Sequence, residues 1–119
     1  MDDLTHRIIG AAIEVHRVLG CGLLESIYEA LCHELMLRGI AFERQIAVDV
    51  NYKGHIIIGQ RLDILIDRKV VVELKSVSKL PDVALAQTLS YLKATGLKRA
   101  RLINFGEQLL KNGIKRISL

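Results

Sequence analysis

The segment VVVELKSV, residues 70–77, places an acid and a base inside the most apolar strand-like stretch of the chain. Its valines and Leu74 predict a buried β-strand, in which side chains alternate between two faces. Glu73 and Lys75 therefore share one face with Val71, and Val70, Val72 and Leu74 take the opposite face. Because an isolated buried charge is too costly to persist, the fold must supply partners for these two side chains.

The simplest partner for each charge is the other, as an ion pair at a sheet edge. Asp63, in the apolar segment RLDILI, offers a second arrangement. If residues 67–69 form a three-residue turn, Ile66 faces Val70 and Asp63 falls opposite Glu73, with Cβ atoms about 4.5–5.5 Å apart. A two-residue turn would instead place Asp63 on the wrong face, so the interpretation depends on this register.

Two carboxylates at that distance repel each other unless a positive charge lies between them. A hard divalent cation with oxygen ligands, Mg²⁺ or Mn²⁺, suits such a pair. A cation held in this way polarises a phosphoryl oxygen and lowers the pKa of a bound water. Lys75 would point into the same site, where it could orient or deprotonate the attacking water or stabilise charge on the phosphate.

The rest of the sequence predicts helices before and after a group of strands. The first expected helix starts at Asp2 or Asp3 and ends at Leu19, and the second runs from about Leu24 to Arg38 with Gly39 as the stop. The third runs from Pro81-Asp82 to Gly96, with Leu85, Leu89 and Leu92 facing inward. The expected strands are residues 42–52 and 55–66 with a turn at Lys53-Gly54, residues 70–77, residues 101–105, and residues 114–119 after a turn at Asn112-Gly113.

The resulting order is α-α-β-β-β-α-β-β, an α/β sandwich. The strand–helix–strand succession predicts a parallel crossover, and the three-strand meander before it is antiparallel, so the sheet is mixed. The length of 119 residues suits one domain, residues 1–119.

Composition narrows the class of protein. No segment is apolar over the roughly 20 residues needed to cross a bilayer. Cys21 and Cys32 show neither zinc nor disulfide spacing, which favours a cytoplasmic protein with free thiols. Residues 96–119 carry six Lys or Arg and one Glu, a basic end that could follow a phosphate backbone or serve only as a solvated surface.

The wider pattern resembles the PD-(D/E)xK nuclease superfamily. An Asp followed ten residues later by ExK matches its core motif, although Leu62 stands where the name-giving proline would be. The segments GQRLD (59–63) and QTLSY (87–91) look like the GxxxD and QxxxY elements of its RecB-like branch. GLLESIY (22–28) resembles the signature of the GxxExxY family, and INFG (103–106) and GIKRI (113–117) extend the likeness.

The resemblance implies a restriction-endonuclease-like α/β/α sandwich with Asp63 and Glu73 as metal ligands and Lys75 as the catalytic lysine. It also implies that Glu25 completes the metal site, although an acid in the first turn of a helix is favoured by the macrodipole alone. His16 corresponds to an upstream histidine ligand of some RecB-like nucleases, the alternative being a locally hydrogen-bonded helix residue.

Gln87 and Tyr91 lie four residues apart and therefore share a helix face, distinct from the leucine stripe. In RecB-like enzymes the corresponding pair borders the active site, whereas the alternative for Tyr91 is simple core packing. Tyr28 is expected to pack or hydrogen-bond near Glu25 and not to react.

These features favour a small Mg²⁺- or Mn²⁺-dependent nuclease that hydrolyses phosphodiester bonds, with DNA favoured over RNA. So small a domain covers little nucleic acid by itself, which favours a homodimer or larger assembly. Two other hypotheses stay open. One is a non-catalytic nucleic-acid or protein-interaction module with the same fold, and the other is a metal-dependent phosphohydrolase of small molecules.

Overall fold

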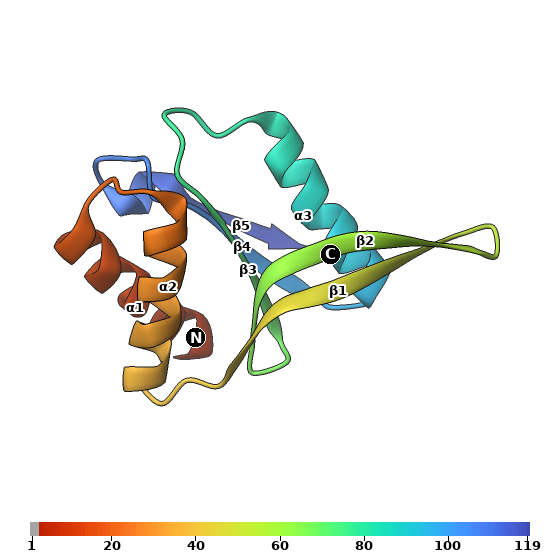
Figure 1. Cartoon of the computed structure of the whole chain (residues 1–119), viewed down its shortest axis with the longest axis horizontal. Helices are drawn as coiled ribbons and strands as arrows, with labels where there is room; N and C mark the ends of the chain where they lie inside the picture. Colours follow the sequence, from red (N-terminus) through yellow and green to blue (C-terminus); the bar gives the residue numbers. More distant parts are fainter. Residues whose placement is uncertain (1–2) are drawn as a thin grey trace.

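Two helices, a three-strand meander, a third helix and two further strands follow one another along the chain (Figure 1). This computed structural model describes residues 3–119. Its elements are α1 (Asp3–Leu19), α2 (Leu24–Leu37), β1 (Phe42–Tyr52), β2 (His55–Ile66), β3 (Val70–Lys75), α3 (Asp82–Thr95), β4 (Arg99–Asn104), the 3₁₀ helix η1 (Leu110–Gly113) and β5 (Ile114–Ser118). The predicted α/β class and element order are confirmed, with η1 as an unpredicted addition.

The turns explain why the elements end where they do. Gly39 and Gly96 have φ angles of 68° and 78°, the left-handed conformation that closes a helix and that glycine adopts at no steric cost. Lys53 and Gly54 both have positive φ, as the tight β1–β2 hairpin requires. Of the two candidate capping residues, Asp2 lies outside the described residues, and Asp3 lies in the first turn of α1 as described.

The five strands form one mixed sheet in the order β1-β2-β3-β4-β5. Every neighbouring pair is antiparallel except β3 and β4, which are parallel and joined through α3. Ile66 pairs with Val70 across residues 67–69, so the predicted three-residue turn and its register are confirmed. In this register, the pairing between β2 and β3 ends next to Glu73, the first charged residue of β3.

Helices cover both faces of the sheet, giving an α/β/α sandwich (Figure 1). Helices α1 and α2 pack on one face against Val70, Val72 and Leu74, whereas α3 packs on the other face, the side of Val71. The alternation predicted for β3 is therefore confirmed. Both cores are almost entirely aliphatic, as expected for a chain without tryptophan.

The buried face of α3 differs from the leucine stripe expected from sequence. Leu92 is fully buried, but Leu85 and Leu89 are only partly buried, and the centre of the inward face is Thr88 and Tyr91. The helix is therefore rotated about its axis from the expected orientation, with the Tyr91 ring on the buried side in place of Leu85 and Leu89. Tyr91 thus belongs to the buried face, whereas Gln87 is exposed, so the two residues do not form a face distinct from the core.

The outer half of the β1–β2 hairpin, residues 50–59, extends beyond the helices (Figure 1), and we call it the hairpin arm. Four of its apolar side chains are exposed by 40–75 %: Tyr52, Ile56, Ile57 and Ile58. An isolated two-stranded hairpin is only marginally stable in water. The arm therefore has apolar surface that the rest of the described chain leaves uncovered.

The segment after Lys75 is held by the side chain of Asn104. Its amide oxygen accepts hydrogen bonds from the Val77 and Gly106 backbone N–H groups, both at 3.0 Å, and its nitrogen donates to the Val77 carbonyl at 2.9 Å. Asn104 is fully buried, and it lies in register with Lys75. These bonds fix the direction in which the chain leaves β3.

No helix within residues 3–119 has the length and apolar character needed to cross a bilayer.

Gly106→Ala is expected to destabilise the fold strongly. A Cβ at this position would lie 2.0 Å from the Val77 carbonyl oxygen, so the backbone after β3 must move and its bonds to Asn104 weaken. We expect a loss of about 2–4 kcal/mol in the free energy of unfolding, measured by urea denaturation. Gly22→Ala is the control, because its Cβ would meet only ordinary contacts at 3.8 Å. Equal stability of the two variants would contradict this account.

Candidate active site

Asp63 lies where strand β2 changes the face that it presents to the core. Leu62 packs on the α3 side of the sheet, whereas Ile64 packs on the α1/α2 side. Opposite Asp63, between the pairs Arg44–Ile64 and Ile46–Leu62, Gln45 has a φ of 52°. A side-chain-bearing residue with positive φ is uncommon in a strand, and here it breaks the alternation beside Asp63.

Beyond Ile64 and Val72, the ladder between β2 and β3 is replaced by side-chain hydrogen bonds. The backbone N–H of Asp63 donates to Glu73 Oε2 at 2.6 Å, and the backbone N–H of Leu74 donates to Asp63 Oδ2 at 2.9 Å. Each carboxylate thus uses one oxygen to secure the other strand. Within residues 3–119, the second oxygen of each accepts no hydrogen bond.

Burial and mutual repulsion make this carboxylate pair resist ionisation. Glu73 is only 6 % exposed, and burial followed by the charge of Asp63 raises its pKa to about 8. Burial also raises the pKa of Asp63, against the opposing effects of the Leu74 N–H bond and the charge of Lys75. A cation at the pair would relieve both effects, since it favours the charged form of each group.

Lys75 extends from β3 on the same face as Glu73 and is half-buried. Its charge lowers the pKa of both Asp63 and Glu73, so its ammonium group contributes to the electrostatics of the pair. The strand is also held at this point on its other side, because the Phe105 N–H donates to the Lys75 carbonyl at 2.7 Å. Lys75 is therefore anchored through its backbone, while strand alternation places its side chain on the same face of β3 as Glu73.

Tyr91 approaches the same group from α3. Burial raises the pKa of its hydroxyl, and the charges of Glu73 and Asp63 raise it further. The Gln87 amide donates to the Tyr91 hydroxyl oxygen at 3.0 Å. The two residues of the QxxxY element are thus coupled to each other, with Tyr91 beside the carboxylates.

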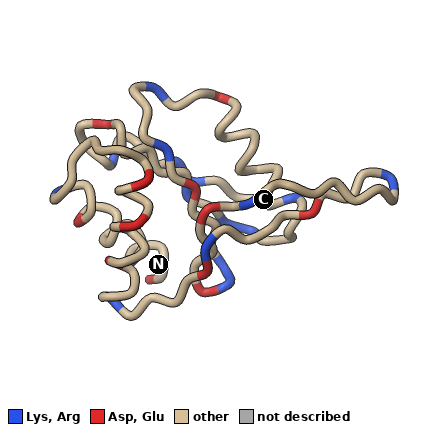
Figure 2. The backbone as a smooth tube through the Cα atoms, viewed as in Figure 1, with Lys and Arg blue, Asp and Glu red and all other residues tan. Residues whose placement is uncertain are grey.

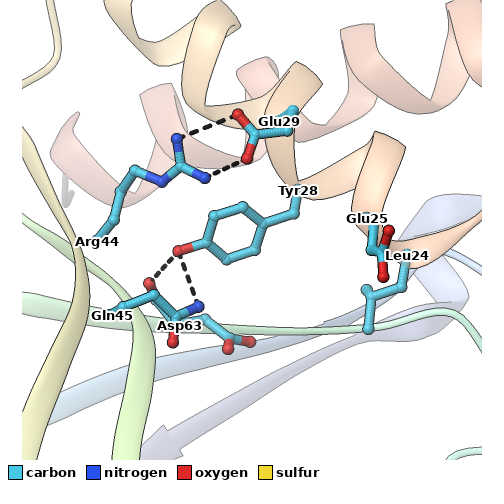
Figure 3. A pocket seen from close by; sticks show the side chains of 7 residues that line it. All are labelled: Leu24, Glu25, Tyr28, Glu29, Arg44, Gln45 and Asp63. Carbon is cyan, nitrogen blue, oxygen red and sulfur yellow. Dashed lines mark hydrogen bonds and ion pairs between the residues drawn. The ribbon is translucent and has the colours of Figure 1, made fainter.

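A pocket of about 480 Å³ opens beside Asp63, between α2 and the β1–β2 hairpin (Figure 3). Its lining residues are Leu24, Glu25, Tyr28, Glu29, Arg44, Gln45 and Asp63. Glu25 is exposed and reaches this pocket from the first turn of α2. The pocket therefore brings Glu25 and Asp63 to one cavity.

Tyr28 connects α2 to the strand that carries Asp63. Its hydroxyl donates to the Asp63 carbonyl at 2.6 Å and accepts from the Gln45 amide at 3.3 Å (Figure 3). The expectation of a local hydrogen-bonding role agrees with these contacts. Gln45, in contrast, has no signal in the sequence, because its positive φ becomes apparent only in the folded hairpin.

A family model for the PD-(D/E)XK nuclease superfamily matches residues 2–117. The chain belongs to this superfamily. Its mixed five-stranded sheet between helices agrees with the restriction-endonuclease-like fold. Comparisons with curated proteins and with solved structures give no significant match. Membership indicates a nuclease with a nucleic-acid partner, and nucleases of this superfamily generally use divalent metal ions.

The carboxylate pair of this PD-(D/E)XK protein suits a hard divalent cation in its chemistry. Mg²⁺ is commonly held by one or two carboxylates, with water and substrate phosphates completing the coordination. Asp63 and Glu73 provide two such groups, each with an oxygen left over from its backbone contact. No group of three or more His, Cys, Asp or Glu side chains among residues 3–119 is arranged to hold a metal.

His16 is engaged elsewhere in the superfamily domain. Its Nε2 lies 2.7 Å from the Glu107 carbonyl oxygen, and its ring lies 6.1 Å from that of Phe105. This is the locally hydrogen-bonded arrangement that was the alternative to metal ligation. The exposed thiol of Cys21 also lies near the carbonyls of Gly106 and Glu107, so both residues secure the chain after β4.

The basic residues of the C-terminal segment do not form one surface. Figure 2 shows Lys and Arg distributed over many parts of the chain. Lys115 pairs with Leu102, on the α3 side of the sheet, whereas the next residue, Arg116, pairs with Arg101 and takes the other side. Arg101 is only 4 % exposed, so it is unavailable as a surface contact for phosphate.

Glu73→Gln is expected to stabilise the metal-free protein above pH 5. With a pKa raised from 4.5 to about 8, Glu73 costs no stability at low pH, and the cost grows as the pH rises through this interval. Gln keeps an oxygen for the Asp63 N–H without the charge. Urea unfolding in EDTA should therefore show the variant gaining a few kcal/mol over wild type between about pH 4.5 and 8. A constant difference across this range would contradict the assignment.

Proposed function

We propose that the protein is a metal-dependent nuclease that hydrolyses phosphodiester bonds, with DNA preferred to RNA on the basis of the family resemblance. The observation that carries the proposal is the carboxylate pair of half-buried Asp63 and buried Glu73, next to Lys75 in a superfamily fold. A carboxylate pair that resists ionisation is a costly feature for a purely structural strand. Its cost is explained if a cation occupies the pair during function.

In this proposal, Asp63 and Glu73 hold Mg²⁺ or Mn²⁺. Glu25 would join them from the pocket side only if its side chain moved toward the pair, because no three such side chains among residues 3–119 are grouped around one point. The ion supplies Lewis-acid polarisation of the phosphate and a more acidic bound water. Lys75 orients or deprotonates the attacking water, or stabilises charge on the phosphate. His16 would join the ligands only if it released the Glu107 carbonyl.

Gln87 and Tyr91 form the α3 wall of the proposed site. The hydrogen bond between them orients the Tyr91 hydroxyl beside the carboxylates, where it can contact either the carboxylates or the nucleic acid. The exposed basic side chains Lys111, Lys115 and Arg116 are proposed as separate backbone phosphate contacts, since Lys115 and Arg116 lie on opposite sides of the sheet.

The finer classification is also part of the proposal. The elements GQRLD, QTLSY and GLLESIY support a GxxExxY protein of the RecB-like branch, forming one nuclease-like domain over residues 1–119. The free thiols Cys21 and Cys32 support a cytoplasmic location.

Lys75→Ala is expected to abolish cleavage while leaving the metal pair intact. Wild type should cleave at least one of four substrates, single-stranded, duplex or branched DNA or RNA, in Mg²⁺ or Mn²⁺. Lys75→Ala should lose at least a hundredfold in rate yet keep the rise in melting temperature that Mn²⁺ causes, whereas Glu73→Ala should lose both.

Lys69→Ala is the matched control, because Lys69 lies just before β3 at the end remote from the site. Nucleic-acid binding without cleavage under every metal would support the non-catalytic module. The absence of a group of three metal-ligating side chains within residues 3–119 also agrees with that alternative. Hydrolysis of nucleotides alone would support the small-molecule phosphohydrolase.

We also propose a homodimer, or a larger assembly, formed through the hairpin arm. The arm exposes Tyr52 and three consecutive isoleucines, and Lys53 is its only Lys, Arg, Asp or Glu. A surface so poor in charge fits another copy of itself better than a phosphate backbone, and an isologous contact doubles the apolar area buried.

Ile58→Lys is expected to convert the assembly to a monomer, because the side chain is 75 % exposed in the single chain and would bury a charge in the contact. Light scattering after gel filtration measures the mass. Met36→Lys, on an exposed position of α2, is the control and should leave the mass unchanged. A monomeric wild type at tens of micromolar would refute the dimer.

A further inference from the structure

One wall of the pocket beside Asp63 is held in place by contacts that metal binding does not require. Arg44 lies on β1, facing Glu29 of α2, and forms an ion pair with two guanidinium–carboxylate hydrogen bonds (Figure 3). Its guanidinium carbon also lies 4.8 Å from the centre of the Tyr28 ring. The flat guanidinium is therefore fixed from two directions.

Tyr28 is itself fixed, which makes the wall rigid. Its hydroxyl is bonded to the Asp63 carbonyl and to the Gln45 amide. The plane of Arg44 is thus tied through Tyr28 to the backbone of the residue that carries the proposed metal ligand. Any group that stacks in this pocket is positioned relative to the carboxylate pair.

The charges of the pocket favour a base over a phosphate. Glu29 neutralises Arg44, and Glu25 and Asp63 add two further acids to the lining. A second phosphate would be repelled here, whereas a planar, uncharged base is attracted to a guanidinium plane. Leu24 adds apolar surface, and the Gln45 amide and Glu25 provide groups that can hydrogen-bond a base edge.

We propose that this pocket binds one unstacked nucleobase next to the scissile phosphate, with Arg44 as its stacking plane. The inference rests on the proposed nuclease function and specifies its substrate. A volume of about 480 Å³ accommodates one base with its sugar. A base within an intact duplex must leave the stack to enter, which costs energy that an unpaired base does not. The substrate is therefore single-stranded nucleic acid or an unpaired end.

The test compares Arg44→Lys with Arg68→Lys. Lysine keeps the positive charge and loses the plane, and Arg68 is a matched control because it also pairs with a glutamate on the same hairpin, away from the pocket. Wild type should cleave a single-stranded DNA oligonucleotide at least ten times faster than the same sequence as a blunt duplex. Arg44→Lys should lose about tenfold on the single strand, with an unchanged Mn²⁺-dependent melting shift, and Arg68→Lys should match wild type.

Faster cleavage of the duplex, wild-type activity of Arg44→Lys, or equal impairment of Arg68→Lys would overturn the proposal. A binding measurement distinguishes failure of the pocket proposal from failure of the nuclease proposal. If wild type cleaves no substrate, the nuclease proposal fails, and fluorescence anisotropy of labelled oligonucleotides with Lys75→Ala protein decides the pocket. At least tenfold tighter binding of the single strand, lost in Arg44→Lys/Lys75→Ala, supports the pocket, and equal binding of strand and duplex overturns it.

Discussion

Two hydrogen bonds hold strands β2 and β3 together at the candidate site. The Asp63 N–H donates to the Glu73 carboxylate, and the Leu74 N–H donates to the Asp63 carboxylate. They replace the ladder where β2 and β3 stop pairing, and they hold two carboxylates together in a place where ionisation is unfavourable. Burial and the nearby charge of Asp63 raise the pKa of Glu73 to about 8. In a PD-(D/E)XK fold, this is the arrangement that a divalent cation would stabilise.

The surrounding structure can be understood as support for these two hydrogen bonds. Asn104 fixes the chain after Lys75, and Tyr28 ties α2 to the Asp63 carbonyl. Gln45 takes a strained conformation opposite Asp63, at the point where Leu62 and Ile64 pack on different faces of the sheet. Strain of this kind persists only where neighbouring contacts enforce it, and it is often found near functional sites.

Much of this site could be predicted from the sequence, because register and alternation are local properties. A three-residue turn at 67–69 was enough to place Asp63 opposite Glu73, and the valines of β3 determined its two faces. Long-range contacts were not predictable in the same way. The binding of His16 to the Glu107 carbonyl, the burial of Arg101 and the rotation of α3 around Tyr91 depend on how separate elements pack. Position 106 requires glycine because it lies against the Val77 backbone, a contact that no local sequence pattern predicts.

The central claim is that Asp63 and Glu73 share one cation, and anomalous diffraction from crystals grown with Mn²⁺ tests it most directly. The account predicts a single strong peak about 2.0–2.3 Å from an oxygen of each carboxylate, with Lys75 beside it and no peak in crystals of Glu73→Gln. A map with no peak at the pair, or with manganese bound at other residues only, would contradict it.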